Sequence, residues 1–179
     1  MYHSRFKGTH YEAGFAYGAL LKKRGIRLTT CPTFPITKKR ITFGQACMEA
    51  IQPYYPQIIE EVQGMAAGNT CDLNFLNALI FTMFCHEDAV HCSCFAYRRE
   101  DEIVLGRNSD FLVSIEKSYS NVIYHLDKAI AFTGNTTAFV EIEDGVNAYG
   151  LAVGITFIPV HIIQPGFNIG ILTRYLLET

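Results

Sequence analysis

Residues 92–107 read Cys92-Ser-Cys-Phe-Ala-Tyr-Arg-Arg-Glu-Asp-Glu-Ile-Val-Leu-Gly-Arg107. Two runs rich in apolar residues flank the polar turn at 98–101, and this pattern is typical of a β-hairpin. A hairpin returns the chain on itself, so residues near its open end come close together. The sequence therefore predicts that Arg107 and Asp110, which follow Cys92 by 15 and 18 residues, approach this cysteine.

The segments on either side of the hairpin differ in kind. The first ninety residues are typical of helices, which we expect at about 11–24, 43–52, 56–67 and 73–86. The later residues are typical of strands, expected at about 119–127, 137–143 and 148–158, with Asp144-Gly145 as a turn, before a final helix over 169–178. This order predicts an α+β fold in which helices cover antiparallel strands.

Length and composition limit the function classes. A chain of 179 residues predicts one domain, or one domain with a small appendage. With 49% apolar and 18% charged residues it can bury a core, which excludes a disordered chain. The net charge of −2 offers no electrostatic basis for binding a nucleic acid or a membrane surface. The first residues lack the apolar core of a signal peptide, so we expect a cytoplasmic protein.

The densest group of reactive side chains is Cys85-His-Glu-Asp-Ala-Val-His-Cys-Ser-Cys94. One interpretation is a metal site built from Cys85, His86, His91, Cys92 and Cys94, which are suitable ligand types. On a strand, however, Cys92 and Cys94 share one face while His91 points to the other. A second interpretation is a Cys-x-Cys redox pair, which lacks the usual two-residue gap. The third is a single nucleophilic cysteine.

A nucleophilic Cys92 would need a base, and the sequence contains no Cys–His signature. If the bond between His91 and Cys92 breaks, the cysteine gains an α-amine, which can accept the thiol proton near neutral pH. Arg107 would favour the thiolate, and Asp110 would hold and orient the ammonium form. A purely structural interpretation stays open on spacing alone: an Arg107–Asp110 surface ion pair beside small, buried cysteines.

Five segments together carry a family resemblance. They are Lys7-Gly-Thr-His-Tyr-Glu-Ala-Gly14, Cys92-Ser-Cys-Phe-Ala96, Leu105-Gly-Arg-Asn-Ser-Asp-Phe111, Asp144-Gly-Val-Asn-Ala-Tyr-Gly-Leu151 and Gly166-Phe-Asn168 with Arg174-Tyr-Leu-Leu-Glu178. In this order the chain resembles the N-terminal-nucleophile hydrolases of linear amides. That family includes choloylglycine hydrolases, penicillin V acylases and acyl-CoA:6-aminopenicillanic acid acyltransferases. The most specific segment is the Arg-Asn-x-Asp-Phe sequence placed 15 residues after a Cys-Ser.

The resemblance implies a fold and a set of site residues. Cys92 matches the nucleophile, Arg107 and Asp110 match the site arginine and aspartate, and self-cleavage would cut His91–Cys92. The implied fold is a four-layer αββα sandwich, with 1–91 as a helical pro-segment and 92–179 as the start of the catalytic domain. Asn147 matches an Asn-x-x-Gly-Leu segment. A structural role at the strand turn and a role toward substrate or oxyanion both remain open there.

The chain also departs from the family. His91 stands where the acyltransferase branch often has glycine, and the family's oxyanion-hole asparagine and a distant arginine would lie beyond Thr179. We therefore expect a C-terminally incomplete member with little or no activity.

The expected reaction is attack by Cys92 on a small-molecule amide, through a thioester that is then hydrolysed or transferred. It needs no cofactor or metal ion. We expect no nucleic-acid or membrane partner, and homo-oligomer formation stays open. The alternative from another class is a non-catalytic Cys/His metal-binding domain.

Overall fold

The computed structural model describes residues 2–85, 91–110, 113–156 and 162–179. In chain order the elements are β1 (Tyr2–Gly8), α1 (His10–Lys23), η1 (Leu28–Thr30), α2 (Lys38–Ile51), α3 (Pro56–Asn69), α4 (Leu73–Phe81), β2 (His91–Arg99), β3 (Glu102–Asp110), η2 (Val113–Ser118), β4 (Ser120–Leu126), β5 (Phe132–Thr136), β6 (Asp144–Asn147), β7 (Ala152–Gly154) and α5 (Ile169–Glu178). Within these ranges, no helix has the length and apolar character that crossing a bilayer requires.

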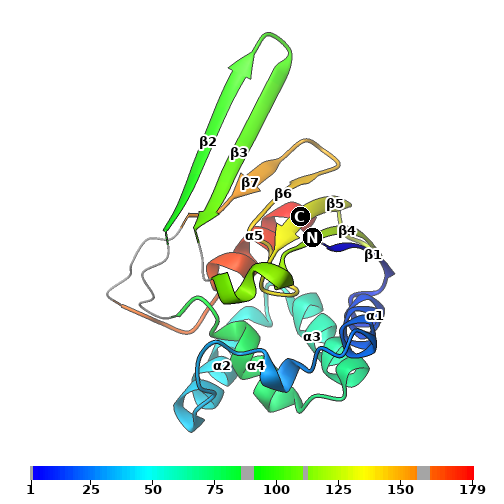
Figure 1. Cartoon of the computed structure of the whole chain (residues 1–179), viewed down its shortest axis with the longest axis vertical. Helices are drawn as coiled ribbons and strands as arrows, with labels where there is room; N and C mark the ends of the chain where they lie inside the picture. Colours follow the sequence, from blue (N-terminus) through cyan, green and yellow to red (C-terminus); the bar gives the residue numbers. More distant parts are fainter. Residues whose placement is uncertain (1, 86–90, 111–112, 157–161) are drawn as a thin grey trace.

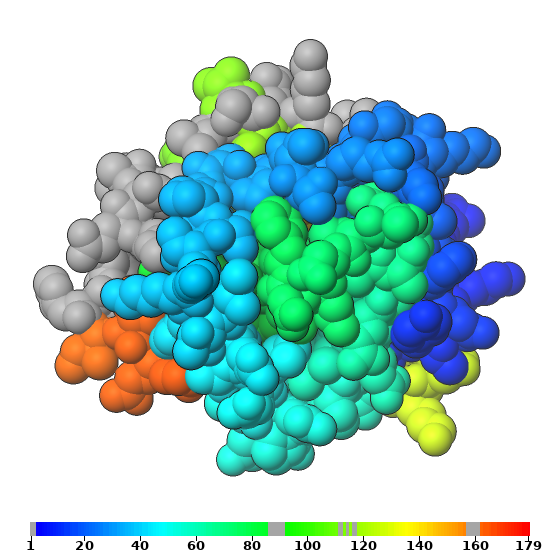
Figure 2. All heavy atoms as spheres, turned by 90° about the horizontal axis from the view of Figure 1, so that it is seen from below, coloured from blue at the N-terminus to red at the C-terminus, as the bar shows by residue number. Residues whose placement is uncertain are grey.

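The strands form two sheets. Five of them pair in the order β1-β4-β5-β6-β7, with β1 parallel to β4 and the other neighbours antiparallel. Strands β2 and β3 form a separate antiparallel hairpin that extends away from the body of the molecule (Figure 1). Helices α1 to α4 lie together below the larger sheet and form one face of the molecule (Figure 2). Helices with antiparallel strands agree with the predicted α+β class, whereas the four-layer sandwich stays a prediction.

The first helix begins where the sequence predicts. The side chain of Thr9 accepts a hydrogen bond from the backbone N–H of Glu12, whose carboxylate accepts one from the backbone N–H of Thr9. This reciprocal capping box satisfies two amides that the helix itself leaves unpaired. It fixes the N-terminus of α1 directly after β1.

Helices α1 and α3 pack with almost no side chains between their backbones. A Cβ atom on Gly14 would lie 1.9 Å from the carbonyl oxygen of Glu61, and one on Gly64 would lie 2.1 Å from that of Tyr11. Gly18 and Gly68 repeat the arrangement one turn later. Glycines spaced four apart on both helices therefore set the distance between them.

A buried charge cluster ties α5 to the helices. The guanidinium of Arg174 is fully buried and donates to the carboxylates of Glu178 and Glu61, at 2.7 Å to the latter, and to the carbonyl of Val140 at 3.0 Å. It also stacks on the ring of Tyr124, 3.8 Å from the centroid. Arg174 of α5 thus contacts α3 through Glu61, β4 through Tyr124 and the segment after β5 through Val140.

Two sequence expectations about strands were wrong. Residues 2–8 form β1 rather than part of a helical segment, because Ser4 and Phe6 face the core while Arg5 and Lys7 face solvent. The interval 137–143 is not a strand: β5 lies at 132–136 instead. In that interval Ala138, Val140 and Ile142 are all buried, which imitates strand alternation, but the residues bend around α5.

The expected turn at Asp144-Gly145 was also wrong. Both residues lie inside β6, where a Cβ on Gly145 would come within 2.6 Å of the Thr133 carbonyl oxygen on the neighbouring strand. Glycine is needed there for close strand packing rather than for a turn. The chain reverses after β6 instead, at Gly150, whose φ is +84°. Of the strand expected at 148–158, only residues 152–154 form a strand, β7. Residues 157 and 158 of the expected strand lie outside the described ranges.

Candidate active site at the foot of the hairpin

The register of the β2–β3 hairpin decides which side chains share a face. Cys92 is paired with Ser109, and Cys94 with Arg107. Directly paired residues in an antiparallel sheet point to the same side, as do residues two apart along a strand. Cys92, Cys94, Arg107 and Ser109 therefore share one face. The predicted hairpin is confirmed, and it brings Arg107 to Cys92.

Arg107 contacts the sulfur directly. Its Nη2 donates to Cys92 Sγ at 3.3 Å, and its side chain is 5% exposed. Three further contacts hold the guanidinium from the body of the molecule. Nε donates to the carbonyl oxygen of Ile155 at 2.7 Å, and Nη1 donates to Glu143 Oε2 at 3.1 Å and to Asp144 Oδ2 at 3.4 Å. The cation is thus fixed from three sides with one edge toward the sulfur.

Glu143 is the carboxylate of this site, and the sequence analysis missed it. Its Oε2 accepts from Arg107 and from Ser109 Oγ at 3.4 Å. Its Oε1 accepts from both the backbone N–H and the hydroxyl of Thr137. Glu143 directly precedes the Asp144-Gly145 pair that was interpreted as a turn. The only feature of the sequence that could have pointed to it was an acidic residue next to a segment that carries the family resemblance.

Asp110 lies on the opposite face of the hairpin. It is paired with His91, and its carboxylate accepts from Asn108 Nδ2 at 2.7 Å. The structure therefore does not bring Asp110 to the sulfur as it does Arg107. The peptide bond between His91 and Cys92 lies inside β2, while the side chain of His91 is outside the described residues.

Asn147 has the structural role, one of the two that the sequence left open. Its side-chain oxygen accepts from the backbone N–H groups of Tyr149 and Leu151, at 3.1 and 3.0 Å. Its amide donates to the carbonyl oxygen of Leu177 at 3.2 Å. These bonds close the turn between β6 and β7 and join it to α5. A role toward substrate stays a prediction.

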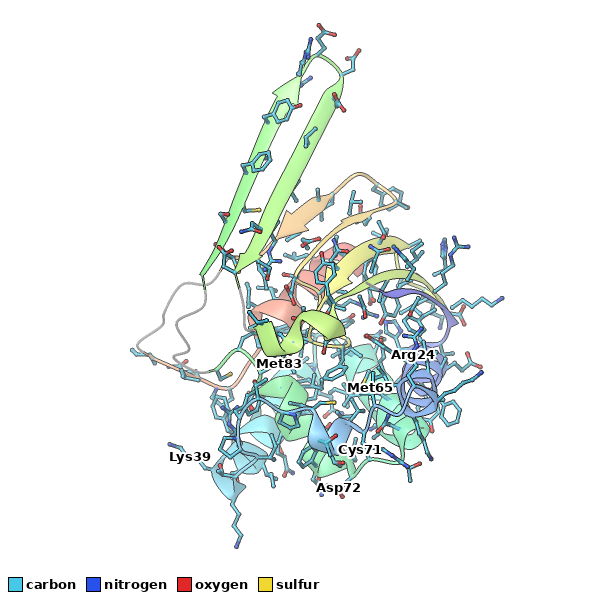
Figure 3. The ribbon with its side chains drawn as sticks, in the orientation of Figure 1. Arg24, Lys39, Met65, Cys71, Asp72 and Met83 are labelled. Atoms are coloured by element: carbon cyan, nitrogen blue, oxygen red, sulfur yellow. The ribbon has the colours of Figure 1, made fainter. Side chains whose placement is uncertain are left out.

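A cavity of about 100 Å³ adjoins the sulfur. Its polar end is formed by Cys92, Arg107, Ser109, Thr137 and Glu143. Its other walls are largely apolar and include Phe34, Leu79, Met83, Phe84, Phe139, Ile155 and Ile169. Figure 3 places Met83 at the boundary between the helices and the elements above them. The lining of the cavity thus combines polar groups around the sulfur with a largely apolar remainder.

Three of the other cysteines are a poorer match to a reactive thiol. Burial raises the pKa of Cys31 and Cys47, and it raises the pKa of Cys85 to about 11, with a further contribution from neighbouring Cys47. Across the part of the chain that the structure describes, no three His, Cys, Asp or Glu side chains lie together as metal ligands. His86, one of the ligands considered above, lies outside that part.

The C-terminal half of the chain matches a known family. The model described as Acyl-coenzyme A:6-aminopenicillanic acid acyl-transferase covers residues 97–179. The resemblance is confirmed over these residues. The acyl-transferase match includes Arg107, Asp110, Glu143 and Asn147 but begins after Cys92. No curated protein matches the chain.

Proposed function

We propose that Cys92 is the nucleophile of a self-cleaving cysteine amidase or acyltransferase that acts on linear, non-peptide amide bonds through a thioester, and that this chain by itself turns over little or no substrate. The observation that carries the proposal is the 3.3 Å contact between Arg107 Nη2 and Cys92 Sγ at the polar end of an apolar cavity. A guanidinium beside a thiol favours the thiolate, which is the reactive form. The family match of residues 97–179 supports acyl transfer as the reaction class.

Self-cleavage would prepare the nucleophile. Cys92 Sγ attacks the carbonyl carbon of His91, the C–N bond breaks, and the nitrogen takes a proton to become the free α-amine of Cys92. Water then hydrolyses the thioester and leaves a carboxylate on His91. The released amine is a base attached to the nucleophile itself. Cleavage also frees the residue opposite Asp110 in the hairpin, and we propose that Asp110 then holds the ammonium form.

Turnover would follow the same chemistry on a substrate. The thiolate attacks the amide carbonyl carbon, the α-amine carries the thiol proton to the leaving amine, and the acyl group stays on Cys92 as a thioester. Water then yields the acid, or a second amine yields a new amide. The apolar walls of the cavity suit the acyl group, while the amine side stays at the polar end.

Intact-mass spectrometry of the purified chain tests the first step. We expect two masses that correspond to 1–91 and 92–179, and one uncut mass for Cys92→Ala. Cys94→Ala is the matched control, because Cys94 lies on the same face and is exposed but makes no hydrogen bond to Arg107 among those of the described residues. It should cleave normally. An uncut wild-type chain, or a cut Cys92→Ala chain, would refute self-cleavage at this bond.

A further inference from the structure

We infer that Glu143 is a positioning residue that holds the Arg107 guanidinium against the Cys92 sulfur. The inference rests on the proposed function and adds a residue to it. It adds a second carboxylate to the site, which acts on Arg107, whereas Asp110 is proposed to hold the ammonium form. The carrying observation is a continuous chain of contacts from Thr137 through Glu143 and Arg107 to the sulfur.

The contacts of Arg107 explain why a second anchor matters. The bond from Nε to the carbonyl of Ile155 fixes one point of the guanidinium, and rotation about that point would carry Nη2 away from the sulfur. The bond from Nη1 to Glu143 fixes a second point and so sets the orientation of the planar group. Arginine is suited to this because its donors lie in a rigid fork.

Glu143 is itself held firmly. Its Oε1 accepts two hydrogen bonds from Thr137, and its Oε2 accepts from Arg107 and Ser109. With both oxygens occupied by donors, the carboxylate is held in one position. Its side chain is 5% exposed, so solvent screens the pair with Arg107 little.

A second carboxylate, that of Asp144, also contacts Arg107. Asp144 Oδ2 lies 3.4 Å from the same Nη1, and its other oxygen accepts from Asn135 Nδ2 at 2.6 Å. Asp144 is farther from Arg107 than Glu143 and more exposed, at 17% against 5%. Glu143 therefore makes the stronger of the two contacts and decides the orientation.

The sign of a Glu143→Gln effect separates positioning from charge alone. A carboxylate that acts merely as a nearby negative charge opposes the thiolate, so its removal would make Cys92 more reactive. A carboxylate that positions Arg107 favours the thiolate indirectly, so its removal would make Cys92 less reactive. Glutamine retains an acceptor for Thr137 but places a second donor against Arg107.

The test is the rate of iodoacetamide alkylation at pH 7, assigned to each cysteine by tandem mass spectrometry. It is run on the Cys92-containing protein in the processing state in which it is purified. In the wild type we expect Cys92 to react faster than exposed Cys94 at pH 7. In Glu143→Gln we expect the Cys92 rate at pH 7 to fall about tenfold, because the cation is no longer held against the sulfur. The Cys94 rate should stay unchanged.

Glu102→Gln is the matched control, since it makes the same change at an exposed position on the same hairpin and should alter neither rate. A Cys92 rate in Glu143→Gln that equals or exceeds the wild-type rate would overturn the positioning role while leaving the proposed function in place. A wild-type Cys92 that reacts no faster than Cys94 would instead refute the activated thiol, and the positioning role with it. Thermal unfolding of both variants shows whether the fold is retained, and Glu143→Asp, which keeps the charge, should recover part of the rate if the fold is intact.

Discussion

Replacement of the buried Arg174 by methionine should destabilise the fold strongly. Methionine fills a similar length but leaves the carboxylates of Glu61 and Glu178 without the cation that both contact. Removal of one partner from a buried ion pair costs about 3–5 kcal/mol, because the remaining charge stays desolvated. For a chain of this size each kcal/mol lowers Tm by about 2–4 °C, so we expect a fall of about 10 °C.

Chemical denaturation followed by circular dichroism measures the loss of unfolding free energy at pH 7. Arg5→Met, at an exposed position of β1, is the matched control. The triple variant Arg174→Met, Glu61→Gln, Glu178→Gln should recover part of the loss, since it removes the uncompensated charges. A loss below about 1 kcal/mol for Arg174→Met alone would show that the cluster is not held as described, because that is the range of exposed ion pairs.

Two further predictions concern the same helices. Burial alone would raise the pKa of Glu178, but the charge of Arg174 and hydrogen bonds from His10 and Tyr55 outweigh it and lower the pKa to about 2. Because the folded value is below the ordinary 4.5, this stability is present above pH 4.5 and is lost as the pH falls toward 2. Between these pH values the wild type should lose about 3 kcal/mol more than Glu178→Gln in denaturant titrations, and parallel pH profiles would contradict the assignment. Gly64→Ala should cost about 3 kcal/mol in the same assay, because its Cβ would meet the Tyr11 carbonyl oxygen at 2.1 Å and force α1 and α3 apart. Gln63→Ala, on the exposed side of α3, should be nearly neutral, and equal effects of the two changes would rule out the close helix contact.

Features determined by nearby residues were predictable from the sequence. The capping box of Thr9 and Glu12 and the hairpin over 92–110 depend on residues close in the chain, and both are confirmed. The approach of Arg107 to Cys92 follows from that hairpin, since both residues lie near its open end on one face. The same spacing places Asp110 at the open end, as expected, but it does not decide on which face of the hairpin the side chain lies.

Features that depend on distant partners were not predictable in this way. Strand β1 is recognised by its parallel pairing with β4, more than a hundred residues later. The alternation of Ala138, Val140 and Ile142 reflects packing beneath α5 rather than a ladder of strands. Glu143 joins the site because the sheet brings β6 beneath the foot of the hairpin, and a single sequence contains no sign of that approach.

The position of Arg107 has a mechanical consequence. The guanidinium that touches the sulfur is also the side chain that fastens the projecting hairpin to the main body, through Ile155 and Glu143. A change at this residue would therefore loosen the hairpin at the moment it removes the cation from the thiol. Kinetic losses in Arg107 variants would then combine a missing charge with a displaced nucleophile.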